Sequence, residues 1–228
     1  MKRAQARQEL RVIARETQGL LRQIRAAGIE KVPGRSTSSP SSADKEQLLE
    51  PVRRKALQCQ ACRLCKERNH VVFGEGSLNA ELMFVGEGPG REEDLQGRPF
   101  VGSAGTLLTK ILQAMGLSRE SVYIANAVKC RPPQNRPPEP DEIEACRGFL
   151  ETQIRTIRPR LICALGRTAV TTLLQTQAPM SALRGKTFEW EGIPLIVTFH
   201  PAYLLRNPPA KKEVWEDMKR AMEILKKG

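Results

Sequence analysis

The chain has 228 residues, 40% of them hydrophobic and 27% charged, the composition of a globular protein with one domain and an appendage, or with two small domains. No run approaches the ~18 apolar residues of a membrane-spanning helix, and the charged N-terminus has no apolar stretch behind it, which excludes a secretory signal. The 37 basic and 25 acidic side chains give a net charge of +12, which suits a polyanionic partner.

The first part of the chain is predicted to form a basic extension. Residues 1–55 carry 13 Lys and Arg against 6 Asp and Glu, a net charge of +7 that leaves +5 for the rest of the chain. Apolar residues recur at helical spacing from Leu10 to Ile24, and a Ser- and Pro-rich segment at 31–44 is typical of a linker. The sequence therefore predicts a partly helical extension over 1–50 and a globular domain over 51–228. The extension is either a solvated tail or an arm that contacts a polyanion or a partner protein.

After the extension, short apolar runs alternate with helical patterns. The predicted strands are 82–85, 122–125, 161–165, 187–190 and 193–199. The predicted helices are 107–115, 141–157, 168–174 and 211–227, the second of them beginning at a capping Asp141 with Glu144 three residues on. This alternation predicts an α/β domain with a mostly parallel central sheet flanked by helices.

Glycines, an asparagine and a histidine follow the predicted strands. Gly86-Glu-Gly-Pro-Gly90 follows the first strand, Asn126 ends the second, and His200 follows the last. Because ligands bind beyond the carboxyl ends of the strands in open α/β sheets, these residues are expected to converge on one crevice. The glycine segment is equally compatible with a tight turn that binds nothing, and a lone histidine is more often structural than catalytic. These segments therefore locate a site without naming its chemistry.

Six cysteines in a chain without a secretory signal favour metal ligands or buried thiols over disulfides. Four of them form two separated pairs, Cys59 with Cys62 and Cys130 with Cys146. Four thiolates from two such pairs fit either tetrahedral zinc or a [4Fe–4S] cluster, and the spacing does not distinguish these. Cys163 lies in an apolar run and is predicted to be a core residue, whereas Cys65 is predicted to be a free thiol.

Four segments, taken together, resemble a known family. They are GEGPGREED at 86–94, GRPFVG at 97–102, NAVKCRPPQNR at 126–136 and HPAYLLRNP at 200–208. In order and residue type they resemble the family 4 uracil-DNA glycosylases, the iron–sulfur glycosylases of bacteria and archaea. The resemblance implies a central, mostly parallel four-stranded sheet flanked by helices, and an enzyme that flips deoxyuridine from DNA. It also implies hydrolysis of the N-glycosidic bond, which releases uracil and leaves an abasic site for base excision repair.

The resemblance further implies a [4Fe–4S] cluster as cofactor. By position its ligands are Cys59, Cys62, Cys130 and Cys146, because the family pattern C-x-x-C-x-Leu matches Cys59 to Leu64 and leaves Cys65 outside. In this family the cluster is structural, and it joins the N-terminal segment to the loop that carries the second cysteine pair.

The resemblance also implies roles in a uracil pocket. Phe100 matches the residue that stacks on uracil, and Asn126 offers an amide N–H to O4 and its carbonyl to N3–H. Cytosine presents the reverse pattern and would leave buried polar groups unpaired. Glu93 is expected to form a wall near C5 that excludes thymine, and Gly86 lets the base approach the backbone.

Catalysis is expected to rest on stabilising the uracil anion that departs. His200 is expected to donate to O2 as a neutral imidazole, assisted by backbone N–H groups of Glu87 and Gly88. Glu87 is also the nearest carboxylate for handling water, and Asn135 is a second candidate for a polar role. After the base flips, three residues are expected to fill the vacated stack and contact the strand. They are Leu204, Leu205 and Arg206.

The implied partner is uracil-containing DNA, single- or double-stranded, bound by a monomer in the cytoplasm near the nucleoid and away from membranes. Two alternatives stay open. One is a non-catalytic DNA-binding relative associated with replication or repair machinery, against which the joint presence of Glu87, Phe100, Asn126 and His200 speaks. The other is a zinc-stabilised nucleic-acid-binding module. For the extension, DNA and a partner protein are both retained as candidate contacts.

Overall fold

The computed structural model describes residues 40–227, so the predicted helix at 10–24 and most of the predicted linker lie outside the described residues. The strands are β1 (Glu75–Gly76), β2 (Leu82–Gly86), β3 (Tyr123–Asn126), β4 (Leu161–Leu165), β5 (Thr187–Trp190) and β6 (Ile193–Thr198). The α-helices are α2 (Ser42–Leu57), α3 (Arg91–Gln96), α4 (Ser103–Ala114), α5 (Pro140–Ile157), α6 (Gly166–Leu174), α7 (Met180–Leu183), α8 (Pro201–Arg206) and α9 (Lys211–Lys226). Short 3-10 helices are η1 (Arg63–Lys66), η2 (Pro133–Asn135) and η3 (Pro208–Ala210). No helix within 40–227 is long and apolar enough to cross a membrane.

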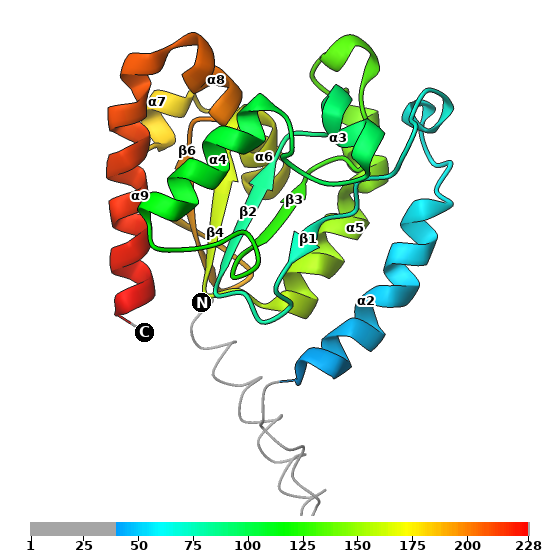
Figure 1. Cartoon of the computed structure of the whole chain (residues 1–228), viewed down its shortest axis with the longest axis horizontal. Coiled ribbons are helices and arrows are strands. Elements are labelled where there is room, and N and C mark those ends of the chain that lie inside the picture. The colour runs from blue at the N-terminus through cyan, green and yellow to red at the C-terminus, as the bar shows by residue number, and fades with distance from the viewer. Residues whose placement is uncertain (1–39, 228) are drawn as a thin grey trace, which may run out of the picture. The chain divides into compact units, whose positions relative to one another are not determined.

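The strands form one mixed sheet in the order β1-β3-β2-β4-β6-β5, and Figure 1 labels all of them except β5. β3, β2, β4 and β6 run parallel, and β1 and β5 pair antiparallel at the two edges. In the part of the chain that the structure describes, the sheet therefore has six strands, not the four that the resemblance implies. The parallel centre matches that expectation. The difference lies in the edges, where β5 turns back onto β6 through Glu191 and Gly192, which adopt positive φ angles of 45° and 80°.

Successive residues of the central strands pack on opposite faces of the sheet, which accounts for their continuous apolar runs. In β2, Met83 and Val85 join a core cluster with residues of α2, α5, α6 and α7. Leu82 and Phe84 join a second cluster with residues of α4, α8 and α9. Helices thus cover both faces of the sheet (Figure 1), and the predicted α/β class is confirmed.

The start of α5 differs from the prediction. The helix begins at Pro140, and the Glu142 carboxylate accepts the Glu139 N–H at 2.8 Å. The predicted cap at Asp141 is therefore wrong by two positions. The physical reason is that proline is favoured in the first turn, where its missing N–H leaves no hydrogen bond unmade.

Helix α2 crosses residue 50, the predicted boundary between extension and domain. Ser41 caps the helix by accepting the Asp44 N–H at 3.2 Å, so the predicted linker gives way to a helix at its last residues. Leu49 is buried in the core, and the Lys45 ammonium donates to the carbonyl oxygens of Leu78 (3.0 Å) and Ile157 (2.9 Å). Residues 42–50 are therefore packed against the α/β unit.

Candidate active site

The strand order places a cavity at the carboxyl edge of the sheet. β2 is the first of the parallel strands along the chain, and it has β3 on one side and β4 on the other. The connections that leave β2 and β3 therefore run to opposite sides of β2. Open α/β sheets bind ligands at the carboxyl end of such a strand. A cavity of about 620 Å³ lies there, within the range of small-molecule sites. Its lining includes eight of the predicted residues: Glu87, Gly88, Glu93, Phe100, Asn126, Asn135, His200 and Arg206. Segments distant in sequence thus converge as predicted.

Gly86, the last residue of β2, allows two of these side chains to meet. A Cβ atom at this position would lie 2.5 Å from the Asn126 Oδ1 and 2.5 Å from the Cζ of Phe100. Both distances are well inside van der Waals contact, so any side chain here would displace the ring or the amide. A Cβ at Gly88 would similarly approach the Val128 Cγ2 to 2.7 Å. The glycines of this segment are needed because other side chains occupy the space.

Asn126 presents an unpaired acceptor to the cavity. The residue is 1% exposed, and its Oδ1 is buried without a hydrogen-bond partner among the described residues. Its backbone carbonyl is in contrast satisfied by the buried ammonium of Lys129 at 2.9 Å, which also donates to Gln153 at 2.6 Å. A buried acceptor without a partner costs ~1–3 kcal/mol, so this oxygen is suited to a donor that a ligand brings.

His200 is held as a neutral imidazole. It stands at the N-cap of α8, where its Nδ1 accepts the Ala202 N–H at 3.2 Å. Burial lowers the pKa of His200 to about 4, so the ring is uncharged near neutral pH. Since Nδ1 accepts, the hydrogen of the neutral ring is on Nε2, which leaves a donor available. The ring centroid lies 5.5 Å from that of Phe100.

Glu87 is oriented by a residue that sequence reasoning did not identify. The Thr168 hydroxyl, near the start of α6 and buried, donates a hydrogen bond to the Glu87 Oε2. Thr168 follows β4, a parallel strand whose carboxyl end lies beside that of β2. Its place just beyond a predicted strand is the only sequence signal that pointed to it.

Five of the six cysteines line one small cavity between the end of α2 and α5. They are Cys59, Cys62, Cys65, Cys130 and Cys146, and none of these five forms a disulfide. The Lys129 N–H donates to the Cys146 Sγ at 3.2 Å, and the Arg68 guanidinium donates to the Cys130 Sγ at 3.3 Å. Burial raises the pKa of the Cys146 thiol to about 11. Cys163 is fully buried in the core, as predicted.

The donor chemistry of this cavity is that of a thiolate centre, with N–H groups already directed at two sulfurs. Within residues 40–227 no three His, Cys, Asp or Glu side chains are placed to hold one metal ion together. Five cysteines around one cavity supply the donor set of a thiolate-bound metal centre, so the residues present fit such a centre.

Comparison with known proteins decides the family. The model of the uracil DNA glycosylase superfamily matches residues 73–219. The type-4 uracil-DNA glycosylase of Thermotoga maritima is 48% identical over 187 residues, which cover 80% of this chain and 97% of that protein. The chain belongs to the type-4 uracil-DNA glycosylases. The enzymes of that name from Saccharolobus solfataricus (47% identical, 74% of this chain, 82% of that protein) and Archaeoglobus fulgidus (42%, 77% and 92%) also match. The predicted family is confirmed, and with it a role as a DNA repair glycosylase.

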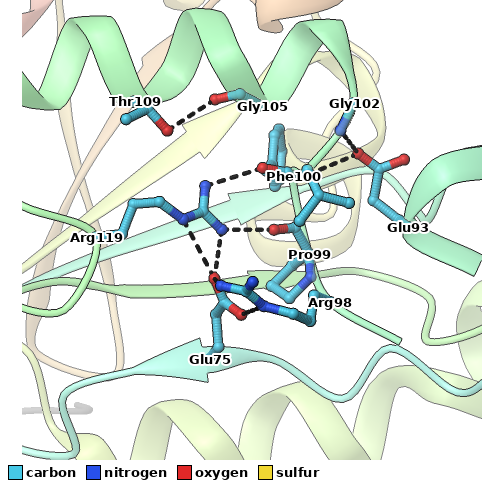
Figure 2. Close-up of polar contacts among 10 residues, drawn as sticks. Glu75, Glu93, Arg98, Pro99, Phe100, Gly102, Gly105, Thr109 and Arg119 are labelled. Atoms are coloured by element: carbon cyan, nitrogen blue, oxygen red, sulfur yellow. Dashed lines mark hydrogen bonds and ion pairs between the residues drawn. The ribbon is translucent and has the colours of Figure 1, made fainter. Parts of the chain in front are cut away.

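In this uracil-DNA glycosylase the Glu93 carboxylate is already engaged by the backbone. Its Oε1 accepts the N–H groups of Val101 and Gly102, both at 2.9 Å, and Figure 2 shows the bond from Gly102. Its Oε2 accepts the Gly90 N–H at 3.2 Å. The carboxylate thereby joins the start of α3 to the segment that follows Phe100. Glu93 lines the cavity as predicted, and it also has this structural task, which the sequence did not reveal.

Leu204 differs from the expectation for a residue that enters DNA. The residue is 1% exposed and packs between α4 and α9, whereas Leu205 is 44% exposed. The reason is that the predicted loop is the helix α8, whose turn directs neighbouring side chains to different sides. Leu204 is therefore a core residue. Tyr203, which sequence reasoning missed, is 38% exposed and lines the cavity with Arg206.

An ion-pair cluster connects the glycosylase pocket to the cysteine segment. The fully buried Glu142 carboxylate accepts from Arg136 at 2.8 and 2.6 Å and from Arg63 at 2.9 Å. The hydrogen bonds from Arg136 are the main reason that the pKa of Glu142 is lowered to about 2. Arg136 lines the pocket and Arg63 follows Cys62, so this one carboxylate fixes both segments relative to α5.

Proposed function

We propose that this chain flips a deoxyuridine out of DNA and hydrolyses its N-glycosidic bond, leaving an abasic site. The observation that carries the proposal is the unpaired Asn126 Oδ1 beside Phe100 in a cavity of about 620 Å³, in a member of this family. Uracil brings the N3–H donor that this oxygen lacks. The Phe100 ring would stack on the face of the base.

Selection against cytosine follows from the same oxygen. Cytosine has an acceptor at N3, so its binding would leave the Asn126 Oδ1 unpaired and face two acceptors toward one another. Sites built on a hydrogen bond to the substrate reject an analogue without it by a factor of ~10⁴–10⁵. For thymine we retain Glu93 as the proposed wall near C5, fixed in place by its three backbone bonds.

His200 would stabilise the departing base. As the bond between C1′ and N1 breaks, negative charge develops on uracil O2, and the His200 Nε2–H would donate to it. Because the imidazole is neutral, it does so without giving up a proton. Backbone N–H groups of Glu87 and Gly88 would assist. One oriented donor of this kind typically contributes ~3–4 kcal/mol to the transition state.

Glu87 would orient the water that completes hydrolysis. Thr168 occupies the Oε2 of its carboxylate, which leaves the other oxygen for a water near C1′. Asn135 is a weaker candidate, because its Oδ1 already accepts from Arg131 at 2.7 Å. Leu205 is proposed as the side chain that fills the vacated stack, with Arg206 contacting the strand.

We also propose that Cys59, Cys62, Cys130 and Cys146 hold a [4Fe–4S] cluster. When bound, the cluster would supply iron–thiolate bonds that join the segment after α2 to α5, and no step of the reaction requires an electron from it. Cys65 lines the same cavity and would remain a thiol. A brown protein whose broad visible absorption disappears on cluster removal supports this assignment, and a colourless zinc protein would contradict it.

The test is incubation of the monomeric, cluster-loaded chain with uracil-containing oligonucleotides, single- and double-stranded, followed by alkali cleavage. Abasic product on either substrate is the expected result. Binding without product on both would support the non-catalytic DNA-binding alternative. An oligonucleotide with cytosine or thymine at the same position is the matched control, and it should stay intact.

A further inference from the structure

We propose that Arg119 is a positioning residue for uracil binding, acting through the backbone of Phe100. The inference rests on the proposed function and deepens it. Arg119 does not line the cavity and lies outside every segment that resembles the family. What connects it to the site is a set of hydrogen bonds to the turn that carries the stacking ring.

The Phe100 backbone is strained. Its φ angle of +52° lies in the left-handed region, which bulky residues rarely adopt. Such a conformation persists only where surrounding contacts impose it. The residue is 5% exposed, and its ring lies against Gly86 and His200. A relaxed backbone would therefore move the ring away from the position where uracil is proposed to stack.

Arg119 bonds both carbonyl oxygens of this turn. Its Nη2 donates to the Pro99 oxygen at 2.7 Å, and its Nη1 donates to the Phe100 oxygen at 2.9 Å (Figure 2). Helix α4 approaches the same carbonyl so closely that a Cβ at Gly105 would lie 1.9 Å from the Phe100 oxygen. The strained turn is thus contacted by both a guanidinium and a helix backbone.

The guanidinium is itself fixed by a carboxylate. The Glu75 Oε1 accepts from the Arg119 Nη2 and also from its Nε, at 3.2 Å. The Arg119 side chain is 15% exposed, so this ion pair is shielded from water. Only a planar, forked cation can serve two carbonyls and a carboxylate together, and a lysine ammonium cannot reproduce that geometry. Glu75, at the edge strand β1, is the anchor of the arrangement.

Arg98 provides a matched control. It also donates to Glu75, at 2.9 Å, but its side chain is 59% exposed and it makes no bond to the turn (Figure 2). Arg98→Met therefore removes one partner of Glu75 and leaves the bonds to Pro99 and Phe100 in place. A difference between the two arginine variants reports on the turn and not on the carboxylate.

The experiment is a double-mutant cycle on kcat/KM for a uracil oligonucleotide, using Arg119→Met, Phe100→Ala and the combination. Arg119→Met alone should lower kcat/KM by about 10- to 100-fold, the range for a misplaced reacting group, and Arg98→Met by less than about twofold. In the Phe100→Ala background, Arg119→Met should lower kcat/KM by less than about a further twofold. Equal losses in both backgrounds, or equal losses in the two arginine variants, would overturn the inference.

A second variant covers the case in which Arg119→Met does not fold. Arg119→Lys keeps the charge opposite Glu75 but loses the fork, and the same dependence on Phe100 is expected for it. An Arg119→Lys protein with unchanged kcat/KM would contradict the inference. If the unmodified protein makes no abasic product, the proposed function fails, whereas an active protein with additive variants refutes only the role of Arg119.

Discussion

His200 shows how much a single residue contributes to this site. One ring nitrogen accepts the Ala202 N–H and begins α8, and the other is left as a donor toward the cavity. Both tasks need the same neutral imidazole. The two tasks can be separated by a substitution to asparagine. The asparagine side chain would still accept the N-cap hydrogen bond, but it is too short to place a donor where the His200 Nε2 lies.

We expect His200→Asn and His200→Ala to lower the excision rate by a similar factor, about 10²–10³, the effect of one lost donor to a developing oxyanion. His200→Ala should also lose about 1 kcal/mol of folding stability through the missing cap, and His200→Asn should not. Single-turnover excision and urea unfolding measure the two effects. Unchanged excision in either variant would remove His200 from catalysis.

The same residue predicts a dependence of stability on pH. The pKa of His200 is lowered by burial from 6.5 to about 4, so between these values the unfolded chain binds more protons at this position than the folded one. The free energy of unfolding is therefore not reduced by His200 above pH 6.5, and it decreases as the pH falls from 6.5 toward 4. We expect the wild type to lose stability relative to His200→Asn between pH 7 and pH 5 in denaturant titrations. Parallel curves for the two proteins would show that the ring is not buried as neutral imidazole.

At the scale of elements, the cysteine cavity joins parts that are far apart in the chain. Cys59 follows α2, Cys130 follows β3, and Cys146 lies on α5, while Glu142 on the same helix binds Arg63 and Arg136. The ion-pair cluster thus attaches the segment after α2 to the domain, and the proposed metal cluster would attach it a second time through its thiolates. Removal of a cysteine that binds the proposed cluster should therefore loosen the whole segment after α2.

Cys146→Ala and Cys65→Ala form a matched pair for this prediction, since both thiols line the cavity. Cys146→Ala should lose visible absorption and lower the melting temperature, because four-ligand attachment of the segment fails. Cys65→Ala should keep both within experimental error. Absorbance spectra and thermal unfolding of the purified proteins decide the matter. Loss of colour in the Cys65 variant would instead exchange the roles of the two residues.

At the scale of the whole molecule, charge is divided between two parts. Residues 1–55 carry +7 of the net +12, although all of them lie outside the segment that matches the superfamily, which begins at residue 73. Since α2 begins at Ser42 and is packed on the core, a deletion that tests the extension should end at residue 39 and not at residue 50. Such a deletion leaves the Ser41 cap intact.

We expect deletion of 1–39 to reduce the salt dependence of DNA affinity while excision by the bound enzyme is retained. For each phosphate that the shortened protein no longer neutralises, the slope of log affinity against log salt becomes less steep by about 0.7–0.9. Binding of a uracil-free oligonucleotide at several salt concentrations measures the slope. An identical slope for the two proteins would rule out phosphate binding by the extension and favour a partner protein or a solvated tail.

The sequence by itself determined the α/β class, the order of the central strands and helices along the chain, and eight of the residues that line the cavity. Those features follow from local patterns, because apolar periodicity, glycines after strands and motif spacing are all written within a few residues of one another. The family match rests on the same local segments.

Only the tertiary structure decided which side chains are free to act. Thr168 reaches Glu87 across 81 positions of the chain, and Arg119 reaches Phe100 across 19. Leucine is a suitable residue type to enter the base stack, but Leu204 is buried by α4 and α9. The Glu93 carboxylate already accepts hydrogen bonds from three backbone N–H groups. Such contacts depend on how distant elements pack, and packing leaves no regular spacing in the sequence from which they could be predicted.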